Sequence, residues 1–330
     1  MSRWGVTAAI TKPVTASALL DALTEVVAHG PTDPQSASRS SSTDTAAPAI
    51  SLANARILLA EDNNVNQLVA TEILRRAGYS CDIANNGREA VAAVLARRYD
   101  LVLMDCQMPE LDGFDATREI RQAQREGRLS TPIAILAMTA NALQGDRERC
   151  LAAGMDDYLS KPVEPRALIN KVRAMLTARP MMPAAVSAPP APSPAAPPPR
   201  ERPPVDVDAL LAHCMNDLAF VDKILTTSQT EFRSMVDTLS RHLAEDDAKK
   251  TTLVAHSLKG AAALLGAEAL RALAADTEAL GRSGDLEQAR QQIGQLQEEV
   301  QRCLAFFPEI PAQLRSHTSP KQPVAKGDPS

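Results

Sequence analysis

The sequence predicts an α/β domain built on a doubly wound, five-stranded parallel sheet, linked to an antiparallel four-helix bundle. Three observations indicate this. Between residues 55 and 178, short apolar segments alternate five times with segments of helical periodicity. Residues 180–204 then hold 11 of the chain's 24 prolines, a composition typical of an extended linker. Beyond this linker the strand signal disappears and helical periodicity alone continues to about residue 307.

The strand candidates of the first domain are short and apolar or rich in β-branched residues. They are Arg56–Ala60, Ser80–Ala84, Leu101–Met104, Pro132–Met138 and Asp157–Leu159. Helices are expected between and after them, for example at Asn66–Ala77 and Glu164–Leu176, with Gly78 and Gly154 at positions of helix C-caps. In such sheets the functional site forms at the C-terminal ends of the strands.

The second domain, residues 205–307, is expected to consist of four helices. Leu, Val, Ala and Phe recur at steps of three and four residues along the first and the last of them. Gly266 and Gly281 are expected to end the two helices between. The predicted helices are about Leu218–Leu243, Ala248–Leu265, Glu268–Leu280 and Leu286–Leu304.

An internal repeat indicates how the remaining residues are organised. The segment AAITKPVTASALLDAL, from Ala8, aligns with DYLSKPVEPRALINKV, from Asp157, at a constant offset of 149 residues. The N-terminus therefore looks like the end of another copy of the α/β domain, and we expect the chain to be a C-terminal piece of a longer protein or to start at an internal Met. The expected segments are a remnant at 1–28, a linker at 29–54, the α/β domain at 55–178, a Pro-rich linker at 179–204, the bundle at 205–307 and a disordered tail at 308–330.

Composition and charge argue against several classes of protein. The net charge of −5 provides no basic patch for nucleic acid. The five cysteines form no CxxC pair, which argues against a zinc site or a disulfide framework. No apolar run approaches the roughly 20 residues of a membrane span, and the first residues lack a signal-peptide core. We expect a cytoplasmic chain, or one tethered to the membrane through a longer parent protein.

Acidic residues follow two of the predicted strands. Glu61 and Asp62 come after the first strand and Asp105 after the third, so the sheet topology should bring them together. Carboxylates this close repel one another unless a hard cation neutralises them, which predicts a Mg²⁺ site. Two further strand ends deliver Thr139, whose hydroxyl can bind a phosphate oxygen, and Lys161, whose ammonium can pair with it.

These residues carry a family resemblance. The segment LVLMDCQMPELDGFDATREI, together with the E-D pair, Met138–Ala140 and Ser160–Pro162, resembles the signature of response-regulator receiver domains over about Ala55–Ala178. The resemblance implies that Asp105 accepts a phosphoryl group and that Asp62, Asp105 and the Gln107 carbonyl bind Mg²⁺, assisted by Glu61 through water. It also implies that Thr139 and Lys161 hold the phosphoryl group, that the Lys161–Pro162 bond is cis and that Tyr158 is the aromatic switch residue.

His256 lies in a predicted helix with one apolar stripe. At 100° per residue, Val254, Leu258, Ala261 and Leu265 form that stripe, and His256 falls on the opposite side. Lys259 and Gly260 share the face of His256, so the pattern predicts a solvent-facing imidazole with a nearby cation and cleared space. The other histidines of the chain (His29, His213, His242 and His317) are interpreted as ordinary surface residues.

The segment AHSLKGAAALLGA around His256 resembles the histidine-phosphotransfer (HPt) signature, over about Val205–Phe307. Together the two resemblances imply a phosphorelay. An upstream histidine kinase would transfer a phosphoryl group to Asp105, Asp105 would transfer it to His256, and a downstream response regulator would accept it from His256. Two alternatives stay open. The chain would be the C-terminal fragment of a hybrid histidine kinase whose ATP-binding core lies upstream, since no G-x-G motif or ATP-binding domain is present. Otherwise it would be an interaction module that is not phosphorylated.

Overall fold

The computed structural model describes residues 55–129, 131–140, 144–177 and 203–318. The expected remnant at 1–28 and the linker at 29–54 lie outside these ranges, as does most of the Pro-rich linker. Within them, the prediction of an α/β domain followed by a helical domain is confirmed. Among the described helices, none is both long and apolar enough to cross a membrane.

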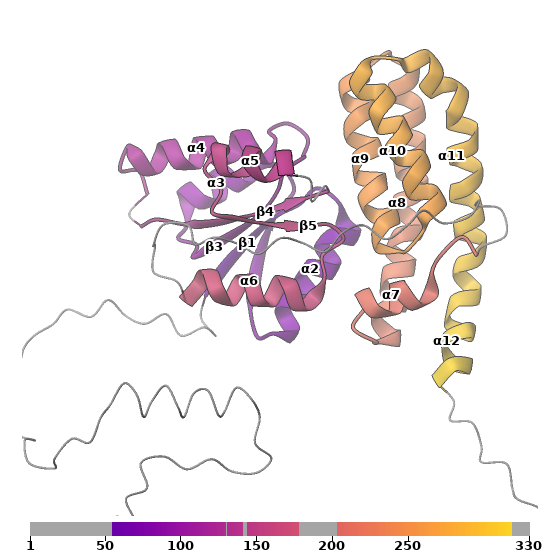
Figure 1. The fold of residues 1–330 in the computed structure, drawn as a ribbon, viewed down its shortest axis with the longest axis horizontal. Coiled ribbons are helices and arrows are strands. Elements are labelled where there is room, and N and C mark those ends of the chain that lie inside the picture. The colour runs from indigo at the N-terminus through magenta and orange to yellow at the C-terminus, as the bar shows by residue number, and fades with distance from the viewer. Residues whose placement is uncertain (1–54, 130, 141–143, 178–202, 319–330) are drawn as a thin grey trace, which may run out of the picture. The chain divides into compact units, whose positions relative to one another are not determined.

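The first domain is a five-stranded parallel sheet in the order β2-β1-β3-β4-β5. Figure 1 shows α2 and α6 on one face and α3, α4 and α5 on the other, as expected for a doubly wound sheet. The strands are β1 (Arg56–Ala60), β2 (Ser80–Ala84), β3 (Leu101–Asp105), β4 (Ala134–Thr139) and β5 (Asp157–Ser160). The helices are α2 (Asn64–Arg76), α3 (Gly87–Ala96), α4 (Gly113–Arg125), α5 (Gln144–Ala153) and α6 (Pro165–Thr177).

Alternation along β1 explains the two layers of helices. Ile57 and Leu59 point into the core beneath α2 and α6, whereas Leu58 points into the core beneath α3, α4 and α5, and all three are almost completely buried. Asn63 begins α2, because its side-chain oxygen accepts hydrogen bonds from the backbone NH groups of residues 65 and 66. Gly78, at φ 84°, follows the end of that helix, as its position predicted.

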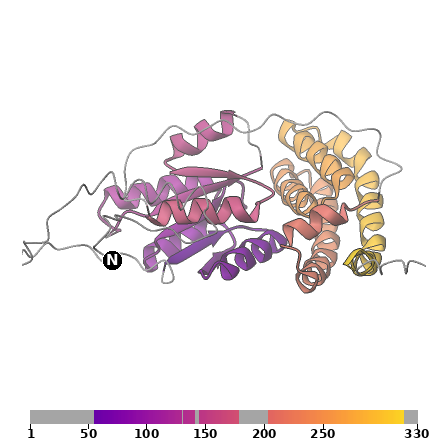
Figure 2. The same ribbon diagram turned by 60° about the horizontal axis from the view of Figure 1, so that its bottom comes forward.

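The second domain is a ring of four helices. In both views α8 (Leu218–Ala244), α9 (Ala248–Leu264), α10 (Glu268–Ser283) and α11 (Leu286–Phe306) lie side by side (Figures 1 and 2). The connections are two or three residues long, so that consecutive helices run antiparallel. Helix α10 runs beyond the predicted end at Gly281 and is ended instead by Gly284, at φ 81°. Gly281 lies within the helix, where it allows close packing: a Cβ would lie 2.6 Å from Oγ1 of Thr252 on α9.

The prediction of a disordered tail from residue 308 is wrong for its first part. A 3-10 turn at Phe307–Glu309 leads into α12 (Ile310–Thr318). Ile310 and Leu314 lie one turn apart on this helix and are buried in the same core as α8. A short helix, α7 (Val207–His213), precedes the bundle.

Candidate functional site

Three carboxylates meet where β1 and β3 end, as the sequence predicted. Oxygen atoms of Glu61, Asp62 and Asp105 lie within 4.8 Å of one another. Parallel pairing of β1 with β3 brings these residues to one edge of the sheet. Glu61 and Asp105 are each only 1% exposed, so water does little to screen their mutual repulsion.

Lys161 joins this cluster from the end of β5. Its Nζ lies 2.6 Å from Oε2 of Glu61 and 2.7 Å from Oδ2 of Asp105. The Lys161–Pro162 peptide bond is cis, as expected. The backbone NH of Lys161 donates to the carbonyl of Thr139 at 2.7 Å, which brings the ends of β4 and β5 together. The structure therefore gathers both predicted phosphate-binding residues at the carboxylate edge.

The cluster carries more negative charge than Lys161 balances. Three ionised carboxylates and one ammonium leave a net charge of −2. Burial and the charge of Glu61 outweigh the lowering effect of Lys161, so that the pKa of Asp105 is raised to about 7 and that of Asp62 to about 6. Buried, clustered carboxylate oxygens that hold excess negative charge fit a hard divalent cation such as Mg²⁺. The backbone NH of Gln107 lies 3.3 Å from Oδ1 of Asp105, while the ligand role of its carbonyl stays a prediction.

Gly113 lies directly against Asp105, whereas Tyr158 lies on β5, two strands away from β3. Gly113 begins α4, and a Cβ at this position would lie 1.9 Å from the backbone oxygen of Asp105. Tyr158 lies half-buried on β5, with Nζ of Lys171 5.5 Å from its ring centroid. Its ring packs against the core beneath α3, α4 and α5, and its role as a switch stays a prediction.

His256 is not solvent-facing, and this prediction was wrong. The side chain is only 8% exposed, and its Nδ1 lies 3.0 Å from Oε1 of Glu278 on α10. A helical wheel places a residue relative to its own helix alone, and α10 covers part of the face that the wheel left open. Lys259 is likewise 15% exposed and pairs with the other oxygen of Glu278, so it is not a solvated cation.

Glu278 is a functional candidate that the sequence reasoning missed. It is 3% exposed and binds His256, Lys259 and Arg282. Burial raises its pKa, but hydrogen bonds and charges from His256 and Lys259 outweigh burial and lower the pKa to about 2. A signal was present in the sequence, because Glu278 falls on the helical stripe of Leu270 and Ala274, where an apolar residue is expected.

The structure brings the carboxylate cluster and His256 to one place. Oγ of Ser257 donates to Oδ2 of Asp62 at 2.6 Å, and Nδ2 of Asn63 donates to the carbonyl of Ser257 at 3.3 Å. The imidazole of His256 is close enough for its charge to lower the pKa of Asp105. Gly260 lies close to α2: a Cβ there would lie 3.3 Å from Nδ2 of Asn66, while its role beside His256 stays a prediction.

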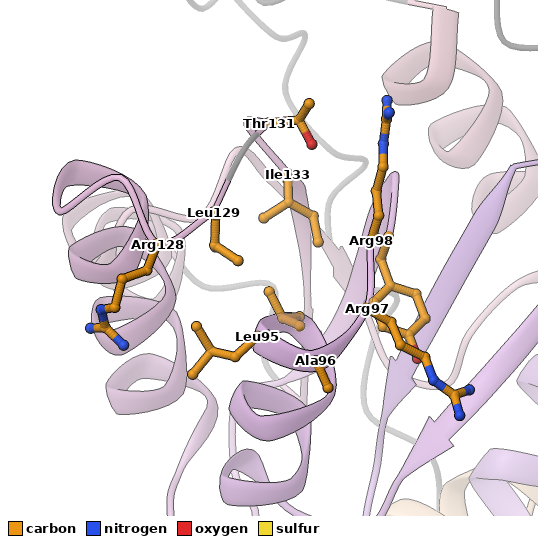
Figure 3. Close-up of a pocket in the computed structure, with 10 residues that line it drawn as sticks. Leu95, Ala96, Arg97, Arg98, Arg128, Leu129, Thr131 and Ile133 are labelled. Carbon is orange, nitrogen blue, oxygen red and sulfur yellow. The ribbon is translucent and has the colours of Figure 1, made fainter.

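A separate cavity of about 220 Å³ lies elsewhere on the α/β domain (Figure 3). Its walls come from the segments that precede β3 and β4, including Arg97, Arg98, Leu129 and Ile133. These segments enter the sheet at the amino ends of the strands, opposite the edge that holds Asp105. The cavity is therefore not part of the carboxylate site.

Comparison with known families agrees with this division of the chain. Residues 57–173 match the response regulator receiver domain, and residues 223–306 match the Hpt domain. Virulence sensor protein BvgS of Bordetella bronchiseptica is 31% identical over 242 residues, which cover 72% of this chain and 19% of that protein. Hybrid signal transduction histidine kinase B of Dictyostelium discoideum is 45% identical over 116 residues, 33% of this chain and 6% of that protein. The chain thus spans less than a fifth of either relative.

Solved structures with similarity to this chain include two receiver domains. One is that of sensor histidine kinase PA1611 from Pseudomonas aeruginosa PAO1, crystallised with magnesium in its active-site cleft. The two sequences are 49% identical, the match covers 38% of this chain and 98% of that chain, and the TM-score is 0.34. Another is the co-crystal structure of Saccharomyces cerevisiae Ypd1 with the receiver domain of Ssk1. The matched chain shares 36% identity, with 37% of this chain and 88% of that chain covered, and the TM-score is 0.35.

Proposed function

Since this chain contains a receiver domain followed by an Hpt domain, we propose that it is a phosphorelay protein that passes a phosphoryl group between Asp105 and His256. The observation that carries the proposal is the hydrogen bond from Ser257, the neighbour of His256, to Asp62 of the carboxylate cluster. This contact brings the imidazole of His256 close to Asp105, although the two residues belong to different domains. Direct transfer requires that proximity.

The ion pairs of Glu278 prepare His256 as a nucleophile. Its low pKa, about 2, keeps Glu278 a carboxylate, which can only accept a hydrogen bond. In the neutral imidazole the proton therefore resides on Nδ1, and the lone pair is on Nε2. Nε2 attacks phosphorus, the bond between phosphorus and the Asp105 oxygen breaks, and the Asp105 carboxylate leaves. The reverse reaction uses the same groups.

The receiver residues act on the phosphoryl oxygens. Lys161 already contacts Asp105 and, when Asp105 is phosphorylated, can pair with an equatorial oxygen, while Thr139 lies next to Lys161 along the strand ends. Glu61, Asp62 and Asp105, with the Gln107 carbonyl, would hold Mg²⁺, which supplies charge neutralisation at the acceptor carboxylate.

The proposed partners follow from this chemistry. An upstream histidine kinase supplies the phosphoryl group from its own phosphohistidine, and the receiver of a downstream response regulator takes it from His256. Because the chain spans only 6% and 19% of its two relatives, we also propose that the ATP-dependent kinase core lies in a longer parent protein or in a separate chain.

Radiolabelled acetyl phosphate tests the proposal. With Mg²⁺, the full chain should acquire base-labile acyl phosphate first and acid-labile phosphohistidine later. Asp105→Asn should abolish both, and His256→Gln should keep the label on Asp105. Base-stable, acid-labile label on the His256→Gln protein would assign the phosphohistidine to another residue. A chain that takes no label at all would instead be an interaction module.

A further inference from the structure

We infer that Arg76 on α2, through its ion pair with Asp217 at the start of α8, is a specificity-determining residue that selects this chain's own receiver as the donor to its Hpt domain. The inference rests on the proposed transfer between Asp105 and His256. It adds which receiver can dock productively on the helical domain.

The carboxylate of Asp217 both caps α8 and binds a cation. One of its oxygens, Oδ1, caps α8 by accepting hydrogen bonds from the backbone NH groups of Ala219 and Phe220, at 2.9 and 3.1 Å. The cap holds the carboxylate in a fixed orientation, so the other oxygen, Oδ2, meets the guanidinium of Arg76 without further ordering. The guanidinium carbon of Arg76 also lies 6.0 Å from the ring centroid of Phe220.

A second contact fixes the other end of α2. Nδ2 of Asn64 donates to the carboxylate of Glu231 on α8. Asn64 and Arg76 are about 18 Å apart along α2, and Glu231 and Asp217 about 21 Å apart along α8, at 1.5 Å per residue. The two helices therefore run antiparallel, and both ends of α2 are held against the first half of α8, which sets their register.

That register determines the position of the reacting groups. The residues just before α2 touch α9 beside His256, through the hydrogen bonds that Asn63 and Asp62 make with Ser257. A slip of one helical turn, about 5.4 Å, would remove these contacts, whereas about 1 Å of misplacement can cost about 100-fold in rate. Arg76 thus acts on the chemistry from the far end of the helix, as a positioning residue. A receiver with an acidic residue at this position would meet Asp217 with like charge.

The expected effects are moderate, because the two side chains are 32% and 34% exposed. Removing the attraction should slow transfer about threefold to fivefold, the range of a partly solvated ion pair. Reversing the charge adds repulsion and should slow transfer about tenfold. Salt should shrink the deficit, since screened charges interact weakly, whereas a defect in folding would not respond in this way.

The test follows the appearance of phosphohistidine in the full chain after labelling with radiolabelled acetyl phosphate and Mg²⁺. Arg76→Glu should slow this step about tenfold and leave the labelling of Asp105 unchanged. Asp217→Asn keeps an oxygen for the helix cap and should slow transfer about threefold. In the double variant the two effects should not multiply, because the repulsion that Arg76→Glu creates disappears with the charge of Asp217.

Arg75→Glu is the matched control. Arg76 and Arg75 both pair with Glu72 within α2, at 2.7 Å, and they carry the same charge. The side chain of Arg75, however, is 69% exposed, and its ion pair lies within α2. The Arg75→Glu substitution should change the rate of phosphohistidine formation less than about twofold. Wild-type transfer by the Arg76→Glu protein, or effects that multiply in the double variant, would overturn the inference while leaving the proposed function intact. Absence of phosphohistidine in the unsubstituted chain would instead reject the proposed function.

Discussion

Nδ1 of His256 and Oε1 of Glu278 lie 3.0 Å apart on the two antiparallel helices α9 and α10. Both side chains are almost completely buried, and the second oxygen of Glu278 binds Lys259. One carboxylate therefore holds the imidazole and the nearby cation together. The proposed reactivity of His256 would therefore depend on this carboxylate as well as on the H-x-L-K-G segment around it.

Replacing Glu278 with Ala should destabilise the Hpt domain. The buried Nδ1 of His256 and the ammonium of Lys259 would lose their acceptor, which typically costs about 1–3 kcal/mol. Urea unfolding followed by circular dichroism measures this loss. Glu268→Ala is the control on the same helix: its side chain is 74% exposed and its ion pair with Arg271 is solvated, so less than about 1 kcal/mol is expected. Equal losses for the two variants would contradict a special role for Glu278.

The ion pairs of Glu278 should make stability depend on acid pH. The pKa of this group falls from its ordinary 4.5 to about 2 in the folded protein. A lowered pKa means that the contribution to stability is complete above pH 4.5 and is lost as the pH falls toward 2. The difference in unfolding free energy between the unsubstituted chain and Glu278→Gln should therefore shrink between about pH 5 and pH 2. A difference that stays constant over this range would show that Glu278 has an ordinary pKa.

A bulky residue at Gly260 should leave the bundle folded and slow transfer. A Cβ at this position would already lie 3.3 Å from Nδ2 of Asn66, so the side chain of Gly260→Leu must push α2 away. Displacement of about 1 Å can cost about 100-fold. Phosphohistidine formation measures the rate and thermal unfolding checks the fold. Gly260→Ala, which asks only for a small shift of a flexible amide, should be much milder, and a Leu variant with an unaltered rate would disprove the contact.

Removing divalent cations should abolish labelling of Asp105. The buried cluster of Glu61, Asp62 and Asp105 carries more negative charge than Lys161 offsets, so its acceptor carboxylate needs further positive charge for an anionic donor to approach. EDTA should stop the mobility shift in a Phos-tag gel, and added Mg²⁺ should restore it. Asp62→Ala should respond only weakly to Mg²⁺; labelling of that variant at the original rate would argue against the assigned ligands.

The sequence predicted the elements and the meeting of the carboxylates better than it predicted exposure. The five strands and the residues at their ends followed from local patterns, because parallel topology leaves one edge at which Glu61, Asp105 and Lys161 can meet. The burial of His256 could not be found in this way, since it depends on α10 and on Glu278, 22 residues along the chain. The helix at residues 310–318 was missed because two apolar residues, Ile310 and Leu314, are too few to reveal periodicity.

The backbone at Gly113 has a consequence for the interpretation of genetic variants. A methyl group there would overlap the main-chain oxygen of Asp105, 1.9 Å away, although residue 113 has no side chain to take part in any reaction. Every missense allele at this codon should therefore shift the strand that presents Asp105 and behave as a loss of signalling. An assessment based only on side-chain chemistry would class the position as neutral, whereas growth under selection should rank it with Asp105 itself.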